Sequence, residues 1–283
     1  MSGELRIDAH LGTRVHIVAG RQGRPVTSAD DGCPFCPGGL EAPERYDVRS
    51  FPNRWPALGP GMCEVVLYTP QHDATFASLG TTGARKVVDL WAERTDHLRS
   101  QPGVRYVAVF ENRGAEIGAT IAHPHGQIYA FDHVPSRPSR LISAGWEPDA
   151  DPGDRLVAAN DHFVAYAQHA SIHPVSLVIA PVIRMPDLPS LSADQRDSLA
   201  SIMVSVLGSL DAVFGAPVPY MMWFMQMPSG SDGDGSWMHL EIVSPWRATN
   251  LHRYVAAVEI ATEEYFNPVD PADIAARLRS AGA

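Results

Sequence analysis

The string His123-Pro124-His125-Gly126-Gln127 is the part of the chain best suited to chemistry. A neutral imidazole nitrogen is a good nucleophile and, once protonated, a good leaving group, so His125 is a candidate to attack phosphorus and carry a phosphoryl-type group between two substrates. The backbone carbonyl of His123 is the expected acceptor for its other ring nitrogen. Gln127 would lie on the same face of an extended segment and donate an amide hydrogen to a phosphate oxygen.

The residue type at position 127 bears on the reaction. A titratable histidine there would favour hydrolysis, whereas Gln127 cannot exchange a proton and would leave a covalent intermediate waiting for a second substrate. The pattern therefore favours transfer. An isolated His-x-His is more often a pair of ordinary histidines, and only the surrounding residues make the chemical interpretation the better one.

A metal site is the second candidate. Cys33 and Cys36 flank a Pro-Phe pair and precede two glycines, a spacing that lets two thiolates bind one cation. A closed zinc site needs two more ligands, and His72 and His123 are the expected pair, so the zinc would be structural. The alternatives are a redox Cys-x-x-Cys, which lacks a surrounding βαβ pattern here, and two reduced buried cysteines.

Composition limits the class of protein. The 283 residues are 45% hydrophobic and carry a formal net charge of -10, which indicates a globular fold and argues against nucleic acid as a partner. Three cysteines do not resemble a disulfide framework. We expect a cytoplasmic protein with no signal peptide, no apolar run long enough to span a bilayer and no membrane partner.

The elements that must position these residues occur in the same order in both halves. Strands are expected at 63–68, 104–110 and 125–131, with a helix at 83–98; the second half repeats this with strands at 175–180, 220–227 and 237–243 and a helix at 199–214. This pattern predicts an α+β duplication, with halves 1–150 and 151–283. It places His239 opposite His125 and Glu241 opposite Gln127. Asp270-Pro271 predicts the start of a short C-terminal helix.

The chain resembles the galactose-1-phosphate uridylyltransferase family, the transferase branch of the histidine-triad superfamily. Four strings carry the resemblance: Cys33-Pro34-Phe35-Cys36, Phe51-Pro52-Asn53, Phe110-Glu111-Asn112-Arg113-Gly114-Ala115-Glu116-Ile117-Gly118-Ala119-Thr120 and His123-Pro124-His125-Gly126-Gln127. The likeness is clearest from about residue 33 to 131 and continues more weakly to about 264. It implies duplicated histidine-triad-like half-domains, with an antiparallel sheet and helices packed on it, and commonly a homodimer.

The resemblance also implies a ping-pong reaction. His125 would attack the α-phosphorus of a nucleoside diphosphate sugar, and a second sugar 1-phosphate would capture the nucleotidyl-histidine. Asn112 would line the site, Thr120 would stand where a phosphate-binding serine is frequent, and Asn53 would lie in the base and ribose pocket. The same family points to Cys33, Cys36, His72 and His123 as zinc ligands.

Other positions depart from the family. Arg54 stands where an acidic ribose-binding residue is frequent, and the late sugar-binding group corresponds to Arg253, Glu259 and Tyr265, which would change the preferred acceptor. The alternatives are therefore a phosphorylase of the ADP-glucose type with phosphate as acceptor, a nucleotide hydrolase, and a zinc-stabilised binding protein without turnover.

Some family members hold a second metal with histidines. The matching positions here are Met225, His239 and Glu241, and a thioether is a poor ligand for a hard or borderline ion. We expect no second metal. His239 and Glu241 are expected to form a hydrogen-bonded pair on one strand instead.

Overall fold

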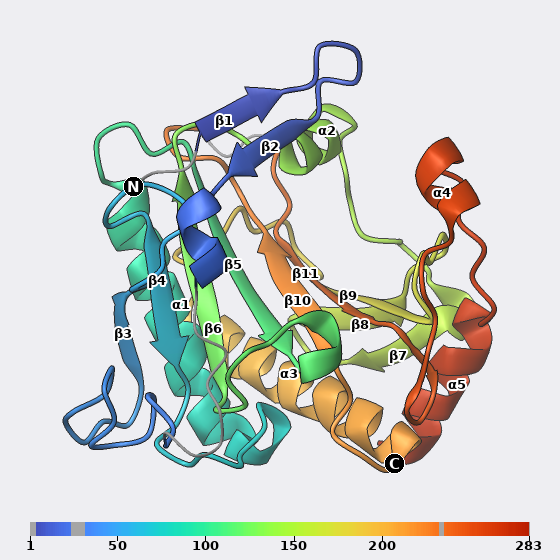
Figure 1. Ribbon diagram of the computed structural model, residues 1–283. Helices are drawn as coiled ribbons and strands as arrows, with labels where there is room; N and C mark the ends of the chain where they lie inside the picture. Colours follow the sequence, from blue (N-terminus) through green and yellow to red (C-terminus); the bar gives the residue numbers. More distant parts are fainter. Residues whose placement is uncertain (1–3, 24–31, 232–234, 283) are drawn as a thin grey trace.

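A computed structural model describes residues 4–23, 32–231 and 235–282. Within these residues, nine strands form one antiparallel sheet in the order β3-β4-β6-β5-β10-β11-β9-β8-β7 (Figure 1). Its strands are β3 (Arg49–Pro52), β4 (Cys63–Leu67), β5 (Tyr106–Arg113), β6 (His125–Phe131), β7 (Leu156–Ala159), β8 (Phe163–Ala167), β9 (Val175–Pro181), β10 (Tyr220–Met225) and β11 (His239–Ser244).

The strand order contains the predicted repeat. In the first half β6 lies between β4 and β5, and in the second half β11 lies between β9 and β10. The two halves meet where β5 pairs with β10, with Phe110 opposite Trp223. The expected α+β fold with an antiparallel sheet is confirmed. The ends of the predicted elements differ from the observed ones: the strand expected to end at Phe110 continues to Arg113, because its last residues pair with the second half, and the helix expected from residue 199 begins at Ala193. The outer strands β3, β7 and β8 were not predicted.

Three helices cover one face of the sheet. They are α1 (Gly80–Arg99), α3 (Ala193–Phe214) and α5 (Pro271–Ala281), the last capped by Asp270, whose side chain accepts from the Ala272 amide at 2.8 Å. By length and composition α3 could cross a membrane, so the expectation that no apolar run is long enough was wrong. Its apolar residues, among them Leu199, Met203 and Leu210, are buried in the core between α1 and the sheet.

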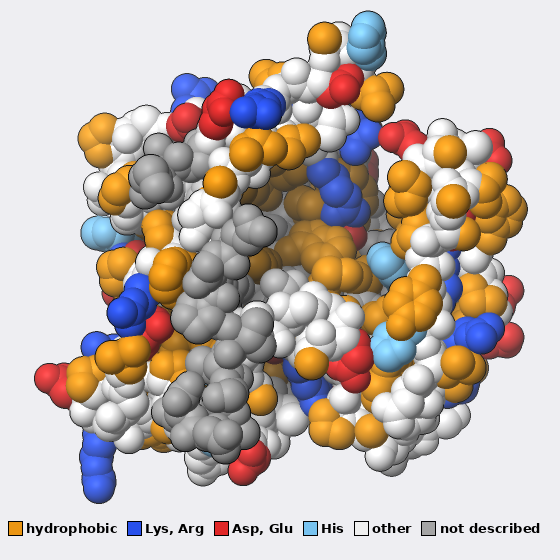
Figure 2. All heavy atoms as spheres, in the orientation of Figure 1, with side chains coloured by type: hydrophobic (Ala, Val, Ile, Leu, Met, Phe, Trp, Pro, Cys, Tyr) orange, Lys and Arg blue, Asp and Glu red, His pale blue; other side chains and the backbone are white. Residues whose placement is uncertain are grey.

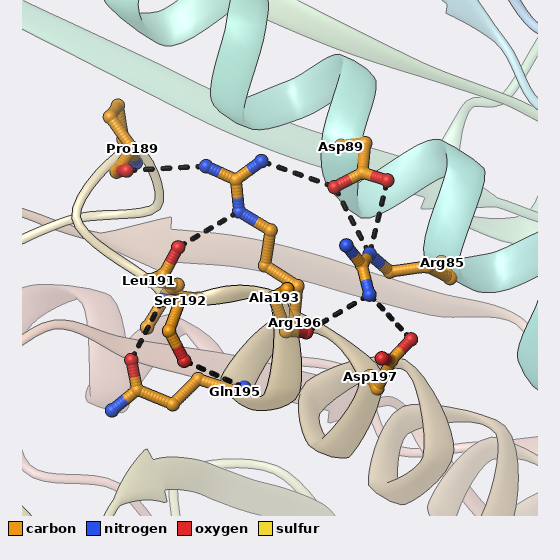
Figure 3. Close-up of polar contacts among 9 residues, drawn as sticks. All are labelled: Arg85, Asp89, Pro189, Leu191, Ser192, Ala193, Gln195, Arg196 and Asp197. Atoms are coloured by element: carbon orange, nitrogen blue, oxygen red, sulfur yellow. Dashed lines mark hydrogen bonds and ion pairs between the residues drawn. The ribbon is translucent and has the colours of Figure 1, made fainter.

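Ion pairs join α1 to the start of α3 (Figure 3). Arg196 reaches Asp89 at 3.1 Å, while Arg85 lies 3.0 Å from Asp89 and 2.5 Å from Asp197. Ser192 begins α3 with a capping box, in which its hydroxyl accepts from the Gln195 amide at 3.2 Å. These contacts fix the two helices against each other beneath the strands that carry the site.

The other face of the sheet is open. Four segments frame it: the hairpin β1 (Glu4–Ile7) and β2 (Arg14–Ile17), helix α2 (Ser136–Ser143), the short turn η4 (Ala115–Ile117), and an arm of β12 (Trp246–Ala248), β13 (Leu251–His252) and α4 (Ala257–Thr262) (Figure 1). Shorter 3-10 turns are η1 (Ala19–Gly23), η3 (Ala77–Leu79) and η5 (Gly153–Arg155). Figure 2 shows this face as a hollow with a largely hydrophobic floor.

Candidate active site and metal centre

His125 is the first residue of β6 and lies on the open face. Along β6 the half-exposed positions alternate with buried ones, so His125 and Gln127 share that face while Gly126 points toward the helices. The Nδ1 atom of His125 lies 2.7 Å from the backbone oxygen of His123, which confirms the expected acceptor. This donation fixes the tautomer and leaves the lone pair on Nε2, the atom suited to attack phosphorus. Phe35 supports the ring edge-to-face, with centroids 5.0 Å apart.

Gln127 is held by the next residue on the same face. The Tyr129 hydroxyl donates to its Oε1 at 3.4 Å, a long bond that turns the carboxamide oxygen toward Tyr129. The Gln127 backbone is flanked by Val65 on β4 and Phe110 on β5. The carboxamide NH₂ is thus the part of Gln127 suited to donate to a phosphate oxygen.

A glycine-containing loop follows β5 beside this strand. Gly114 and Gly118 have φ values of 104° and 85°, which a residue with a side chain adopts only with strain. Thr120 at the end of this loop lines a cleft of about 620 Å³, together with Cys33, His72 and the η4 turn. Asn112 lies on β5 before the loop, on the same face as Phe110 and half-buried. The loop therefore brings a hydroxyl and backbone amides near the metal-ligand candidates.

Asn53 follows β3 at the edge of the sheet. Its side-chain Oδ1 accepts from the Trp55 backbone amide at 2.8 Å, and its backbone amide donates to the Cys63 carbonyl at 2.8 Å. Because Cys63 pairs with Tyr129, Asn53 lies toward the far end of β6 from His125. The neighbouring Arg54 is exposed. This end of the sheet is the place predicted for a base and ribose.

The four predicted metal ligands come together. One donor atom from each of Cys33, Cys36, His72 and His123 lies within 4.8 Å of all the others. The Cys36 sulfur is 3.6 Å from Nδ1 of both histidines. Gly39 closes the cysteine turn, and a Cβ there would lie only 2.5 Å from the Cys33 carbonyl oxygen. The donor set and its closeness fit a tetrahedral zinc ion.

The surroundings of this cluster suit a cation. Burial raises the pKa of the Cys36 thiol, and the neighbouring Cys33 raises it further. Two thiolates this close together therefore require a cation between them. Burial lowers the pKa of His123, which keeps the imidazole neutral for ligation. Its Nε2 lies 2.8 Å from the Thr69 carbonyl, and the Tyr46 hydroxyl lies 2.9 Å from the same nitrogen. Orientation by a backbone carbonyl is typical of metal-bound histidines.

The second half contains a counterpart of the catalytic strand. On β11, Nδ1 of His239 lies 3.2 Å from the carbonyl oxygen of Trp237, two residues earlier. His125 makes the corresponding contact with the His123 carbonyl at 2.7 Å. Here Nε2 instead lies 3.3 Å from Glu241, and Trp146 stacks on the ring with centroids 3.5 Å apart. The expected His239–Glu241 pair is confirmed.

Glu241 also pairs with a residue that the pattern did not reveal. Arg137 on α2 reaches its Oε2 at 2.8 Å, and Gln168 donates to the same oxygen at 3.0 Å. Burial opposes ionisation of Glu241, but the bonds from His239 and Arg137 hold its pKa at about 2. The positive partner of this carboxylate is a guanidinium, and the absence of a second metal stays a prediction.

Arg253 and Glu259 lie in the arm, across the open face from β6 (Figure 1). Both are buried and they pair with each other. Glu259 also accepts from the Ala256 and Phe266 amides at 2.6 and 2.7 Å. Within one chain, these two predicted sugar-binding residues shape the arm and are not brought to His125.

Comparison with known proteins identifies similar chains. Family models described as the N- and C-terminal domains of galactose-1-phosphate uridyl transferase match residues 57–135 and 120–266. The galactose-1-phosphate uridylyltransferase of Thermotoga maritima is 33% identical over an alignment of 310 positions, gaps included, which covers 98% of each chain.

Solved structures have the same fold. A uridylyltransferase structure superposes with a TM-score of 0.86 at 26% identity, over 99% of this chain and 98% of the other. An ADP-glucose phosphorylase from Arabidopsis thaliana, solved with ADP-glucose, gives a TM-score of 0.77 at 23% identity, over 99% and 98%. The second likeness concerns the fold alone.

Proposed function

The chain belongs to the galactose-1-phosphate uridylyltransferase family, and we propose that it moves a nucleoside monophosphate from a nucleoside diphosphate sugar to a sugar 1-phosphate through a covalent nucleotidyl-histidine. This is a nucleotidyltransferase reaction of galactose metabolism. Its two steps share one intermediate, so the kinetics are expected to be ping-pong.

One observation carries the assignment of the nucleophile: Nδ1 of His125 donates to the His123 carbonyl at 2.7 Å. In the proposed first step, Nε2 of His125 forms a bond to the α-phosphorus, and the bond from phosphorus to the sugar 1-phosphate oxygen breaks. The imidazolium formed is stabilised by the same carbonyl. In the second step, a phosphate oxygen of the acceptor displaces Nε2 and restores the neutral ring.

Polar groups along β6 and around its ends are proposed to bind the substrates. Gln127 would hold the α-phosphate oxygens by donating hydrogen bonds from its NH₂ group. Because a carboxamide does not titrate, it would not pass a proton to or from water. Thr120 would bind phosphate at the cleft, Asn112 would line the site, and Asn53 would contact the ribose. Arg54 beside it supports no choice between uridine and another base.

Zinc is proposed to bind Cys33, Cys36, His72 and His123 as a structural ion. When bound, it would join the N-terminal turn, the segment after β4 and the residue whose carbonyl holds His125. The metal would thereby fix the position of the His123 carbonyl without contacting the substrate. Reduced thiols are required for this role, which supports a cytoplasmic location.

We also propose a homodimer of chains whose two halves, 1–150 and 151–283, are copies of one unit. The arm exposes Tyr254 by 79%, Ile260 by 69% and Phe266 by 65%, more apolar surface than a free arm usually presents. A second copy of the chain is the proposed partner that covers these side chains, because Arg253 and Glu259 lie apart from His125 in their own chain. The partner's arm would supply them to the site.

The test is adduct formation with a panel of nucleoside diphosphate sugars and no acceptor. Intact mass should increase by one nucleoside monophosphate in the wild type and stay unchanged in His125→Ala. His97→Ala, which changes an exposed histidine on α1, is the matched control and should form the adduct. No adduct with any donor would refute the nucleotidyltransferase.

The second step distinguishes the alternatives. Release of a nucleotide sugar when a sugar 1-phosphate is added supports the transferase. Release of a nucleoside diphosphate on addition of phosphate would identify a phosphorylase, and rapid loss of the monophosphate to water would identify a hydrolase. Tight binding of a nucleotide without an adduct or turnover would identify a binding protein without enzymatic activity.

A further inference from the structure

Gly126 separates the proposed nucleophile from Gln127 and points to the buried side of the sheet. A Cβ at this position would lie 2.2 Å from the hydroxyl oxygen of Tyr68 and 3.2 Å from the Phe110 carbonyl oxygen. Only glycine lets the strand approach that hydroxyl so closely. Tyr68 therefore lies directly beneath the backbone between His125 and Gln127, and the Tyr68 amide also donates to the Pro124 carbonyl at 3.3 Å.

Beside Tyr68 lies a buried carboxyl group that the proposed reaction does not use. Glu111 on β5 is 4% exposed, and the Tyr220 hydroxyl donates to its Oε1 at 2.8 Å. Its Oε2 and the Tyr68 hydroxyl are both buried and form no hydrogen bond of good geometry with the described residues. The two groups are near enough for the phenol to lower the pKa of Glu111. Glu111 is thus hydrogen-bonded to Tyr220 and lies near Tyr68 without a hydrogen bond of good geometry. Tyr68 is the residue that contacts β6 at Gly126.

The other charged groups around Glu111 belong to a single pair. From the same strand, the Arg113 guanidinium lies 5.3 Å from the centre of the Tyr220 ring, and it binds Asp211 of α3 at 2.9 Å. Among the described residues, the ionisable groups facing this carboxyl are therefore Tyr68 just after β4, Tyr220 from β10, and Arg113 with Asp211. The cluster joins both halves of the sheet to α3.

The protonation state of Glu111 changes in the neutral range. Burial raises its pKa to about 7, although Tyr220, Arg113 and Tyr68 oppose the rise. The ionised carboxylate can accept from both phenols, with Oε1 bound by Tyr220 and Oε2 available to Tyr68, whereas a proton on Oε2 makes that oxygen a donor toward Tyr68. The Tyr68 hydroxyl must then take another orientation beneath Gly126.

We propose that Glu111 is a positioning residue for the transfer reaction: in its ionised form it holds the Tyr68 hydroxyl beneath Gly126 and so sets the spacing of His125 and Gln127. The proposal rests on the proposed function for its kinetic consequence. Its structural consequence, a backbone at Gly126 that responds to the protonation of Glu111, is independent of that function.

The kinetic test uses Glu111→Gln, which keeps the shape and one acceptor but cannot ionise. The maximal rate of adduct formation should fall by about ten- to a hundredfold, because a small displacement of reacting groups has effects of this order. The half-saturating donor concentration should change little. Glu64→Gln is the matched control, since Glu64 is a buried carboxylate on β4 that pairs with Arg94 at 2.7 Å. Equal rates in the two variants would overturn the proposal.

The structural test follows the Gly126 amide by NMR in ¹⁵N-glycine-labelled protein between pH 5.5 and 8.5. The wild type should show a transition near pH 7 that is absent in Glu111→Gln. Tyr220→Phe, which keeps the carboxyl but removes its donor, should move the midpoint upward, and the double variant should show no transition. A midpoint unchanged by Tyr220→Phe, or a transition that survives Glu111→Gln, would refute the role of Glu111. An intact transition without any adduct would refute the proposed function alone.

Discussion

At the scale of single residues, the proposed nucleophile His125 depends on a carbonyl that belongs to a metal-ligand candidate. His123 directs Nδ1 into the Cys33, Cys36 and His72 cluster, while its backbone oxygen receives the Nδ1 proton of His125. One residue therefore connects the metal centre to the tautomer of the reacting imidazole. Loss of the metal is expected to affect activity through this carbonyl.

Cys36→Ala should remove both the metal and part of the stability. Elemental analysis should find about one zinc ion per chain in the wild type and almost none in this variant, with a clearly lower melting temperature, because a structural zinc contributes directly to folding. Cys63→Ala is the control: Cys63 is buried at 1% exposure outside the cluster, so this variant should keep its zinc. A metal-free wild type with full activity would contradict the structural role.

Residue types and spacing were sufficient to predict that Cys33, Cys36, His72 and His123 come together and that the His123 carbonyl is the acceptor for His125. Tyr46 could not be predicted, because nothing in the residues around it indicates that its hydroxyl reaches the Phe35 carbonyl at 2.6 Å and lies beside His123. Arg137 was missed for a similar reason. A partner far away in the chain leaves no local pattern.

At the scale of secondary-structure elements, the sequence predicted the central strands of the sheet, the helices α1, α3 and α5 and the repeated order of the halves, but not the outer strands β3, β7 and β8. The apolar run after Gln127 identified β6, and apolar stripes of helical period identified α1 and α3, because such patterns depend only on the residues of the element itself. The pairing of β5 with β10 was not predictable, since it depends on how the two halves come together. That pairing extended β5 to Arg113 and buried Glu111 between the halves.

Burial of Glu111 on β5 predicts a pH-dependent stability. Its pKa is raised from 4.5 to about 7, so the folded state binds a proton more tightly than the unfolded chain. The stability from this group is present below about pH 4.5 and is lost as pH rises toward 7, with a size of about 3 kcal/mol. Urea unfolding at several pH values should show this loss in the wild type but not in Glu111→Gln. Parallel pH dependences in the two proteins would contradict it.

At the scale of the whole molecule, the exposed arm predicts assembly. Ile260→Asp places a charge on an apolar side chain that is 69% exposed, so it should shift a dimer toward the monomer without lowering the stability of the chain. Analytical ultracentrifugation measures the shift. Thr82→Asp changes an exposed, uncharged residue of α1 and is the control for one added negative charge. A wild type that stays monomeric at micromolar concentration would refute the dimer.

Mixing variants tests whether the arm serves the partner's site. Neither His125→Ala nor Arg253→Ala should be active alone, but a mixture allowed to exchange subunits should regain activity, because each mixed pair contains one site with both residues intact. Recovered activity would also show that Arg253→Ala still folds. No recovery despite proven exchange would place Arg253 outside the partner's site.

The pairing of β5 with β10 has a consequence for the edges of the two halves. Separated from the second half, the first would present β5 as an uncovered edge with free amide and carbonyl groups, which readily recruits another strand. Because the corresponding strands of the two halves face each other there, the simplest strand to recruit is β5 of an identical molecule. Joining the two halves in one chain covers the edges of β5 and β10 at once, so β5 is held by β10 without a second molecule. In the second half the position of His125 is taken by His239, whose ring stacks on Trp146 and whose Nε2 lies 3.3 Å from Glu241.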